Sequence, residues 1–242
     1  MHIKPIKTRI FRESENLLSF IYHYVPTIPE KSILVVTSKI VALAEGRVVP
    51  YLDMNDKSFG TLVKEESDWA IRTKYTWLTL KDNTVMASAG IDRSNADGKM
   101  ILLPKDSFIS ARAVLAKIRT HYTRKEVGVL ITDSRLLPLR AGVVGVATGY
   151  AGFGGVRDYR GHKDIFGRML HFSRTDIADS LATAAVLTMG EGNERRPLAL
   201  ITDAPVVYLK HNPSKKELHI DPREDVYQPF FTHIKNIRPK GY

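Results

Sequence analysis

Four short apolar runs, spread along the chain as far as residue 202, constrain its fold most strongly. They occupy residues 33–37, 127–132, 143–147 and 198–202 and are rich in valine, leucine and isoleucine. Runs of this length and composition are typical of buried β-strands. The sequence therefore predicts a sheet assembled from distant parts of the chain.

Two longer segments have helical periodicity. In residues 107–122, apolar side chains recur at the spacing of one helix face, with basic residues between them. Residues 175–189 are apolar almost all round, which is typical of a helix buried in a core or a subunit interface. A short helix is also predicted for residues 68–75, and Ser38 is expected to cap a helical turn after the first strand. Together, these elements predict an α/β (α+β) fold.

The length of the chain favours one elaborated domain or two intimate lobes. With 242 residues, it is long for one ordinary core and short for two. Residues 205–242 contain five prolines and are expected to form an extended arm with short strands. We therefore divide the chain into a main domain, residues 1–204, and a C-terminal arm, residues 205–242, packed on the same unit.

Composition limits the function classes. The chain has no cysteine, no secretory signal and no apolar stretch of membrane-spanning length, so a cytoplasmic protein without a membrane partner is expected. Its net charge of +10 indicates an anionic partner. The charge is spread along the chain, and there is no RNP-type motif or zinc-ligand spacing. Small phosphorylated molecules are therefore favoured over nucleic acid.

A loop of small and polar residues follows the apolar residues 85–87. Gly90 permits close backbone approach or a positive φ. Asp92, Ser94 and Asn95 favour tight turns and carry side-chain oxygens or amides. The segment is interpreted either as a ligand-binding loop or as a well-formed turn without further role.

The run Ala-Gly-Ile-Asp-Arg-Ser-Asn at residues 89–95 resembles a signature of the γ-glutamyl ligases of the deazaflavin coenzyme F420. Three further segments resemble motifs of that family in the same order. They are residues 35–41 with 45–47, residues 129–134 with Pro138 and Arg140, and residues 158–167 followed by Ala178 and Asp179. The resemblance spans residues 33–202. It implies the γ-glutamyl ligase fold and an intertwined homodimer, with residues 175–189 as a candidate interface helix.

Two aspartates are the candidate metal ligands. Asp133 follows a predicted strand, where α/β proteins commonly bind ligands, although it could instead form a turn. Asp179 lies in the first turns of the helix at 175–189, where it could simply interact with the helix dipole; Asp176 fits a capping box. The resemblance implies that Asp133 and Asp179 bind Mg²⁺ or Mn²⁺, with Ser180 as a weaker ligand and Arg140 as a further catalytic residue.

The nucleotide and the other substrates need anion-binding groups, because the chain contains no Walker motif. Ser38 and Lys39 lie at a strand-to-helix junction suited to phosphate, although Lys39 could also be a surface lysine. The resemblance assigns Ser38 and Lys39 to GTP. It assigns Gly90, Asp92, Ser94, Asn95 and Arg160 to substrate binding, and it allows for a monovalent cation. The glycine-rich residues 142–155, with arginines around them, predict either a basic cleft or tight packing.

The sequence departs from the family pattern at several positions. Leu136 and Leu137 stand where the family motif has Gly-Arg, Ser180 replaces an acidic residue, and Leu43 replaces a lysine. The family's glycine-rich nucleotide segment is not recognisable in residues 208–242. The resemblance implies GTP-dependent formation of an amide between an acceptor carboxylate and L-glutamate, through an acyl phosphate. The alternatives are a ligase with another acceptor, a weakened or non-catalytic binding protein of the same fold, and, third, a nucleic-acid binder.

Overall fold

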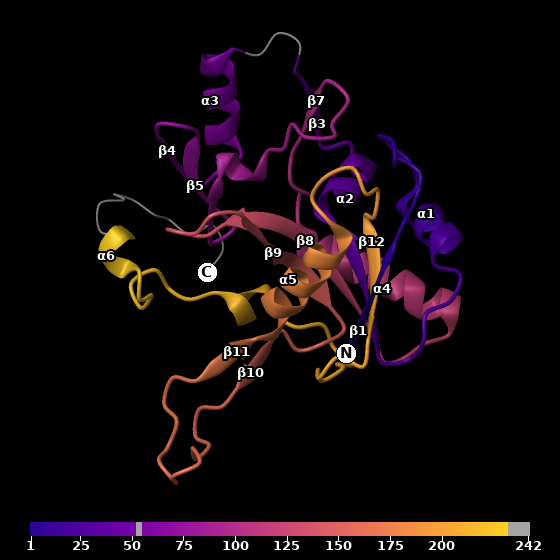
Figure 1. The fold of residues 1–242 in the computed structure, drawn as a ribbon, viewed down its shortest axis with the longest axis vertical. Coiled ribbons are helices and arrows are strands. Elements are labelled where there is room, and N and C mark those ends of the chain that lie inside the picture. The colour runs from indigo at the N-terminus through magenta and orange to yellow at the C-terminus, as the bar shows by residue number, and fades with distance from the viewer. Residues whose placement is uncertain (52–54, 232–242) are drawn as a thin grey trace.

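The computed structural model describes residues 1–51 and 55–231, and its centre is a mixed five-stranded sheet (Figure 1). The strand order is β1-β12-β2-β8-β9. β2 and β8 are parallel, and the other neighbouring pairs are antiparallel. The strands are β1 His2–Ile6, β2 Ser32–Thr37, β8 Val127–Leu136, β9 Val143–Ala151 and β12 Leu198–Thr202.

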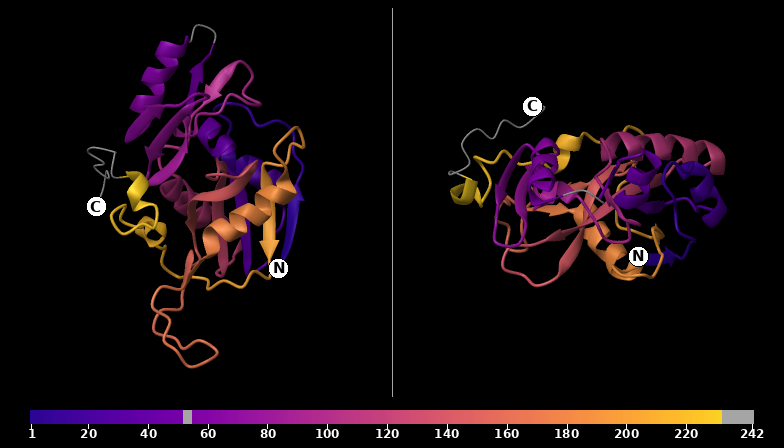
Figure 2. Two further views of the ribbon diagram at one scale, coloured as in Figure 1. Left: turned by 60° about the vertical axis from the view of Figure 1, so that its left-hand side comes forward. Right: turned by 90° about the horizontal axis from the view of Figure 1, so that it is seen from above.

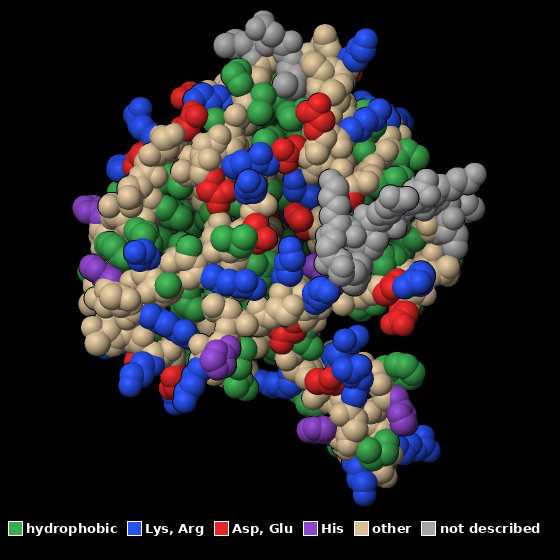
Figure 3. Space-filling view, turned by 180° about the vertical axis from the view of Figure 1, so that it is seen from behind, with side chains coloured by type: hydrophobic (Ala, Val, Ile, Leu, Met, Phe, Trp, Pro, Cys, Tyr) green, Lys and Arg blue, Asp and Glu red, His purple; other side chains and the backbone are tan. Residues whose placement is uncertain are grey.

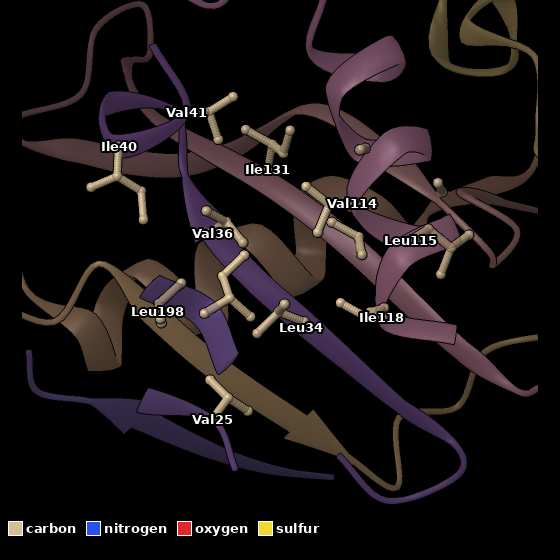
Figure 4. Packing of buried hydrophobic residues seen from close by; sticks show 14 of the residues in the cluster. Val25, Leu34, Val36, Ile40, Val41, Val114, Leu115, Ile118, Ile131 and Leu198 are labelled. Carbon is tan, nitrogen blue, oxygen red and sulfur yellow. The ribbon is translucent and has the colours of Figure 1, made fainter. Parts of the chain in front are cut away.

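Helices cover both faces of this sheet. α1 (Leu17–Tyr24), α2 (Ser38–Ala44) and α4 (Ser107–Tyr122) contribute to the hydrophobic cluster on one face, and α5 (Ile177–Met189) packs on the other. The side chains of β2 show why both faces of the sheet need to be covered by helices. Leu34 and Val36 pack on the α4 side (Figure 4), whereas Ile33 and Val35 pack on the α5 side. All four are fully buried, and each contributes about 1.5–3 kcal/mol through burial.

A smaller lobe lies at one end of the molecule (Figure 2). It contains α3 (Asp56–Glu65), the antiparallel strands β4 (Trp69–Arg72), β5 (Trp77–Lys81) and β6 (Thr84–Ala87), and the pair β3 (Val48–Pro50) and β7 (Lys99–Ile101). Glu66 accepts hydrogen bonds from Arg47 at 2.6 Å and from Lys81 at 2.8 Å. This ion cluster ties the segment after α3 to β5 and to the start of β3.

Two segments extend from the main sheet. β10 (Val156–Asp158) and β11 (Arg174–Asp176) pair over three residues, and residues 159–173 project beyond them (Figure 1). The C-terminal arm contains a 3₁₀ helix, Lys215–Leu218, and α6, Gln228–Phe231. Glu217 accepts hydrogen bonds from the Tyr150 hydroxyl at 2.6 Å and from the Gly155 N–H at 3.1 Å. These bonds hold the arm against β9. Residues 232–242 of the predicted arm lie outside the described ranges.

The predicted strands and the helix at residues 107–122 are confirmed, and the mixed α/β class with them. The helix predicted for residues 68–75 is wrong, because Trp69–Arg72 pairs with β5 as a strand. α5 begins at Ile177, since Thr175 and Asp176 pair with β10. In the described ranges, no helix has the length and apolar character needed to cross a bilayer.

Two local predictions also need correction. β8 continues to Leu136, so Asp133 lies within a strand and does not follow one. Ser38 is the first residue of α2, and Thr37 occupies the N-cap position without a side-chain capping bond. The hydroxyl of Ser38 is therefore available for a contact elsewhere, which is described below.

Candidate active site

A cavity of about 340 Å³ lies between the small lobe, the start of α4, β9 and the C-terminal arm. Charged side chains from the small lobe, the segment before α4, β8, the start of α5 and the C-terminal arm line it, together with an apolar wall. The charged residues include Lys81, Lys105, Arg135, Asp176, Asp179 and Lys215; the apolar wall includes Leu80, Met86, Leu103, Phe108 and Leu218. Small-molecule sites combine an apolar wall with convergent polar groups. This lining is rich in charged residues of both signs, which suits a charged ligand.

Asp176 and Asp179 form an acidic pair where α5 begins. Asp176 is the N-cap, and its Oδ1 accepts the Asp179 N–H at 2.9 Å. Asp179 Oδ1 accepts the Ala147 N–H at 2.8 Å, which fixes the start of α5 to β9. Partial desolvation, together with the charge of Asp179, raises the pKa of Asp176 to about 6. Neither aspartate is in an ion pair with a described residue, so the pair favours binding of a cation.

Asp133 lies beside this cavity and is held by two other polar side chains. Its Oδ1 accepts a hydrogen bond from the Ser38 hydroxyl at 3.2 Å, and its Oδ2 is in an ion pair with Nη1 of Arg135. The Arg135 side chain is only 7% exposed and lines the cavity. Arg135 therefore connects Asp133 to the space that Asp179 also lines.

A second group of predicted residues gathers around Lys39. Its Nζ lies 2.8 Å from Oδ2 of Asp92 and 2.9 Å from the carbonyl oxygen of Ser94. Asp92 Oδ1 accepts the Ser94 N–H at 2.6 Å. Desolvation alone would raise the pKa of Asp92, but the hydrogen bond and charge of Lys39 lower it below its ordinary value. We refer to Lys39, Asp92 and Ser94 as the Lys39 cluster.

The loop after α5 borders both groups, which the sequence did not suggest. Asn95 donates to the carbonyl of Gly192 at 3.2 Å, and Ser134 donates to Glu191 Oε1 at 2.6 Å. Residues 191–192 therefore contact Asn95, which follows Ser94 of the Lys39 cluster, and Ser134, which follows Asp133. Glu191 has no sequence motif around it, so only the chain path reveals its position.

Gly90 and the glycine-rich segment are explained by packing. A Cβ on Gly90 would lie 2.7 Å from the Leu103 side chain, and its φ is +73°. A Cβ on Gly145 would lie 2.5 Å from the Ala182 carbonyl of α5, and one on Gly149 would lie 2.4 Å from the backbone of Ser107 in α4. Gly145 and Gly149 therefore serve tight packing against helices, the second of the two alternatives, and neither lines the cavity, although residues 146–148 of the same segment do.

Of the predicted site residues, only Asp179 lines the cavity. Three of the others, Arg140, Arg160 and Ser180, also belong to neither the Lys39 cluster nor the contacts of Asp133. Arg140 is exposed in the turn between β8 and β9. Arg160 is in the projecting segment, 2.6 Å from Asp158. The Ser180 hydroxyl donates to the carbonyl of Asp176, one helical turn earlier. None of the three is among the described residues that line the cavity.

Mg²⁺ and Mn²⁺ bind hard oxygen ligands such as carboxylates. No group of three or more His, Cys, Asp or Glu side chains in the described ranges is arranged to hold a metal ion. Magnesium sites, however, often use only one or two carboxylates and are completed by water and substrate phosphates. Asp176 and Asp179 supply two such carboxylates inside the cavity, whereas Asp133 is engaged with Arg135. The residues therefore fit a metal that binds together with a phosphorylated ligand.

Comparison with known proteins identifies the family. The family model described as F420-0:Gamma-glutamyl ligase matches residues 5–203. Proteins named coenzyme F420:L-glutamate ligase are similar in sequence. The one from Methanothermobacter thermautotrophicus is 34% identical over 81% of this chain and 84% of its own length. The one from Archaeoglobus fulgidus is 31% identical over 90% and 92%, respectively. The chain therefore belongs to the F420-0:gamma-glutamyl ligase family.

Proposed function

We propose that the protein is a nucleotide-dependent ligase that joins the amino group of L-glutamate to an acceptor carboxylate. The acceptor would be the deazaflavin coenzyme precursor or a related acid, and GTP the co-substrate. The observation that carries this proposal is the cavity lined by Asp179 and Arg135 in a chain of this family. The contact between Ser38 and Asp133 lies beside it. Such a reaction belongs in the cytoplasm, where nucleotide and glutamate are available.

The reaction has two steps. An oxygen of the acceptor carboxylate attacks the γ-phosphorus of GTP, and the bond from that phosphorus to the β,γ-bridging oxygen breaks, which releases GDP. The glutamate nitrogen then attacks the carbonyl carbon of the acyl phosphate. The nitrogen loses a proton to solvent, and the carbon–oxygen bond to the phosphate breaks. The net products are an amide, GDP and inorganic phosphate.

The chain would contribute mainly charge and position to these steps. Lys39 would direct the phosphates, exchanging part of its contact with Asp92 for phosphate oxygens. Lys105 and Lys215 bring further positive charge to the cavity. Asp179, with Asp176 or Asp133, would hold Mg²⁺ or Mn²⁺, which supplies neutralisation of the phosphate charge. Leu80, Met86 and Phe108 would exclude water from part of the cavity.

A homodimer is also part of the proposal. The projecting segment exposes Ile165, Phe166 and Phe172 at 91%, 84% and 91% of their surface. Figure 3 shows hydrophobic, basic and histidine side chains together on this segment. Exposed aromatic and aliphatic side chains that share one projection favour contact with another protein surface. α5, the interface element expected from the sequence, instead uses much of its apolar surface on the sheet of its own chain.

The second candidate function is a binding protein that retains the fold without catalysis. One observation favours it: Asp133 is neutralised by Arg135, and Leu136 and Leu137 are 58% and 46% exposed next to it. Phosphate release with GTP or ATP, Mg²⁺ or Mn²⁺, glutamate and the deazaflavin precursor separates the two candidates. Divalent-dependent release stimulated by both other substrates supports the ligase. Nucleotide binding without turnover supports the binding protein.

A further inference from the structure

Arg135 is the only charged residue among the described residues that are buried. It lies on β8 two positions after Asp133, so both side chains emerge on the same face of the strand. Its side chain lines the cavity together with Asp176 and Asp179. A buried guanidinium in this position requires a partner for each of its donors.

The hydrogen bonds of Arg135 leave part of its guanidinium unused. Nη1 contacts Oδ2 of Asp133 and donates to the carbonyl of Ser134 at 3.0 Å. Nε is buried and has no hydrogen-bond partner among the described residues. A buried donor without an acceptor costs free energy, and arginine is the side chain best suited to bidentate contact with phosphate or carboxylate. Nε itself is enclosed by protein atoms, whereas Nη2 makes no hydrogen bond with a described residue and is not fully buried. Nη2 is therefore the donor that an oxyanion in the cavity would use.

Two other arginines show what a structural role looks like in this chain. Arg112 and Arg119, both on α4, also have a buried Nε without a partner. Their Nη2 atoms donate to backbone carbonyls, of Pro213 at 3.2 Å and of Leu209 at 3.0 Å, and neither residue lines the cavity. An unpaired Nε is therefore not diagnostic alone. Arg135 differs because it is more deeply buried and its side chain lines the cavity.

We propose that Arg135 is an anion-binding residue of the cavity and holds a phosphate or carboxylate oxygen of a substrate. Its bond to Asp133 fixes the guanidinium, and Lys105 and Lys215 also line the cavity. The lining contains seven carboxylates as well, so Arg135 would bind the oxyanion through direct contact and not through the overall charge of the cavity. Arg135 would thereby position the substrate at the edge of the acidic pair. The choice of anion rests on the proposed function, but the presence of an oxyanion site does not.

Calorimetry without metal, in EDTA, tests this assignment with two probes, tripolyphosphate and L-glutamate. Arg135→Met should reduce the affinity for at least one probe about tenfold or more, as expected for loss of a charge-assisted bidentate contact. The affinity of Arg135→Lys should lie between those of Arg135→Met and the wild-type protein, because lysine keeps the charge but lacks the planar guanidinium. Arg112→Lys is the matched control and should bind like the wild-type protein. Loss for tripolyphosphate identifies a phosphoryl site, and loss for glutamate a carboxylate site.

A double variant covers the case in which Arg135→Met fails to fold because Asp133 loses its partner. The double variant Asp133→Asn with Arg135→Met removes both charges and should fold. It should nevertheless show the same loss of affinity, for the same probe, as Arg135→Met. Asp133→Asn alone keeps the guanidinium and should bind that probe at least as tightly as the wild-type protein. A merely structural Arg135 would change the melting temperature without this pattern of affinities. Wild-type affinity in the folded Arg135 variants, or no binding of either probe to the wild-type protein, overturns the assignment.

These outcomes are separable from those of the proposed function. If the wild-type protein binds a probe through Arg135 but never turns over nucleotide, the anion site stands and the ligase proposal fails. If it turns over nucleotide while the Arg135 variants bind both probes normally, the ligase proposal stands and Arg135 is structural.

Discussion

Nζ of Lys39 lies 2.8 Å from Oδ2 of Asp92, and this ion pair joins the first turn of α2 to the loop after the short 3₁₀ helix at Ser88–Gly90. The two residues are far apart in sequence, and each belongs to a motif that resembles a family signature. Their side chains are partly exposed, at 26% and 42%. Lys39 is therefore held in place and still accessible to a ligand.

Substitution of Lys39 tests its role toward phosphate. Lys39→Ala should raise the apparent nucleotide KM about tenfold, because a cation directed at the phosphates is lost. Lys39→Arg should raise the nucleotide KM less than Lys39→Ala does, because arginine keeps the charge but has a different geometry. Lys117→Ala, an exposed lysine on α4, is the control and should have no effect. Equal KM values for Lys39→Ala and the wild-type protein would remove Lys39 from the nucleotide site.

Metal binding should depend on Asp179 more than on Asp133. Asp179→Asn should weaken Mn²⁺ binding by an order of magnitude or more in the presence of nucleotide, because a hard anionic ligand is lost from the cavity. Asp133→Asn should have a smaller effect, since Asp133 is already paired with Arg135. Calorimetry with Asp158→Asn, an exposed aspartate in β10, provides the control. Unchanged Mn²⁺ affinity in both Asp179→Asn and Asp133→Asn would contradict the metal assignment.

Glu66 should make the stability of the protein dependent on pH. Its side chain is 17% exposed. Desolvation opposes ionisation, but Lys81 and Arg47 still hold the pKa of Glu66 below its ordinary value. A lowered folded-state pKa stabilises the protein above the unfolded-state pKa, and this contribution is lost as pH falls through the folded-state pKa.

The corresponding test uses Glu66→Gln. At pH 7 the substitution should lower the free energy of unfolding by about 1–3 kcal/mol, because its partly buried cationic partners Arg47 and Lys81 lose their acceptor. The difference from wild type should shrink as the pH is lowered through the range in which Glu66 is protonated in the folded state. Urea unfolding at several pH values measures this, with the exposed Glu65→Gln as control. A deficit that is independent of pH would show that packing, and not charge, explains the effect.

The projecting segment should control the oligomeric state. Phe166→Glu should convert a dimer into a monomer, because it places a charge on an apolar surface that the partner would bury. Tyr75→Glu is the control, since Tyr75 is 83% exposed but lies in the small lobe. Light scattering coupled to size-exclusion chromatography measures the mass. A monomeric wild-type protein at micromolar concentration contradicts the homodimer.

The fold was largely predictable because its central strands are buried on both faces. Ile33–Val36 and the first residues of β8 read as continuous apolar runs for that reason. The small lobe was harder. Trp69–Arg72 forms a half-exposed strand whose pairing with β5 depends on the turn between them, and local periodicity suggested a helix. The extension of β8 to Leu136 was missed because its later residues are polar.

The candidate site was predictable only where motifs carried it. The segments that resemble family motifs contain Lys39, Asp92, Asp133 and Asp179. The fold brings Lys39 together with Asp92. Arg135 was missed, although its position two residues after Asp133 on one strand places both on the same face. Lys215 was missed because it reaches the cavity from the C-terminal arm, through contacts such as Tyr150 with Glu217 that no local pattern encodes.

The most direct test of the central claim is mass analysis of the acceptor after incubation with GTP, Mn²⁺ and L-glutamate, with GDP and phosphate measured in the same samples. The account predicts an acceptor heavier by one glutamyl residue, formed in equal amount to GDP and phosphate. It further predicts that Asp179→Asn forms little product and that the control Asp158→Asn forms as much as the wild-type protein. Absence of any glutamylated acceptor, with GTP neither bound nor consumed across the deazaflavin precursor and related carboxylates, would contradict the account.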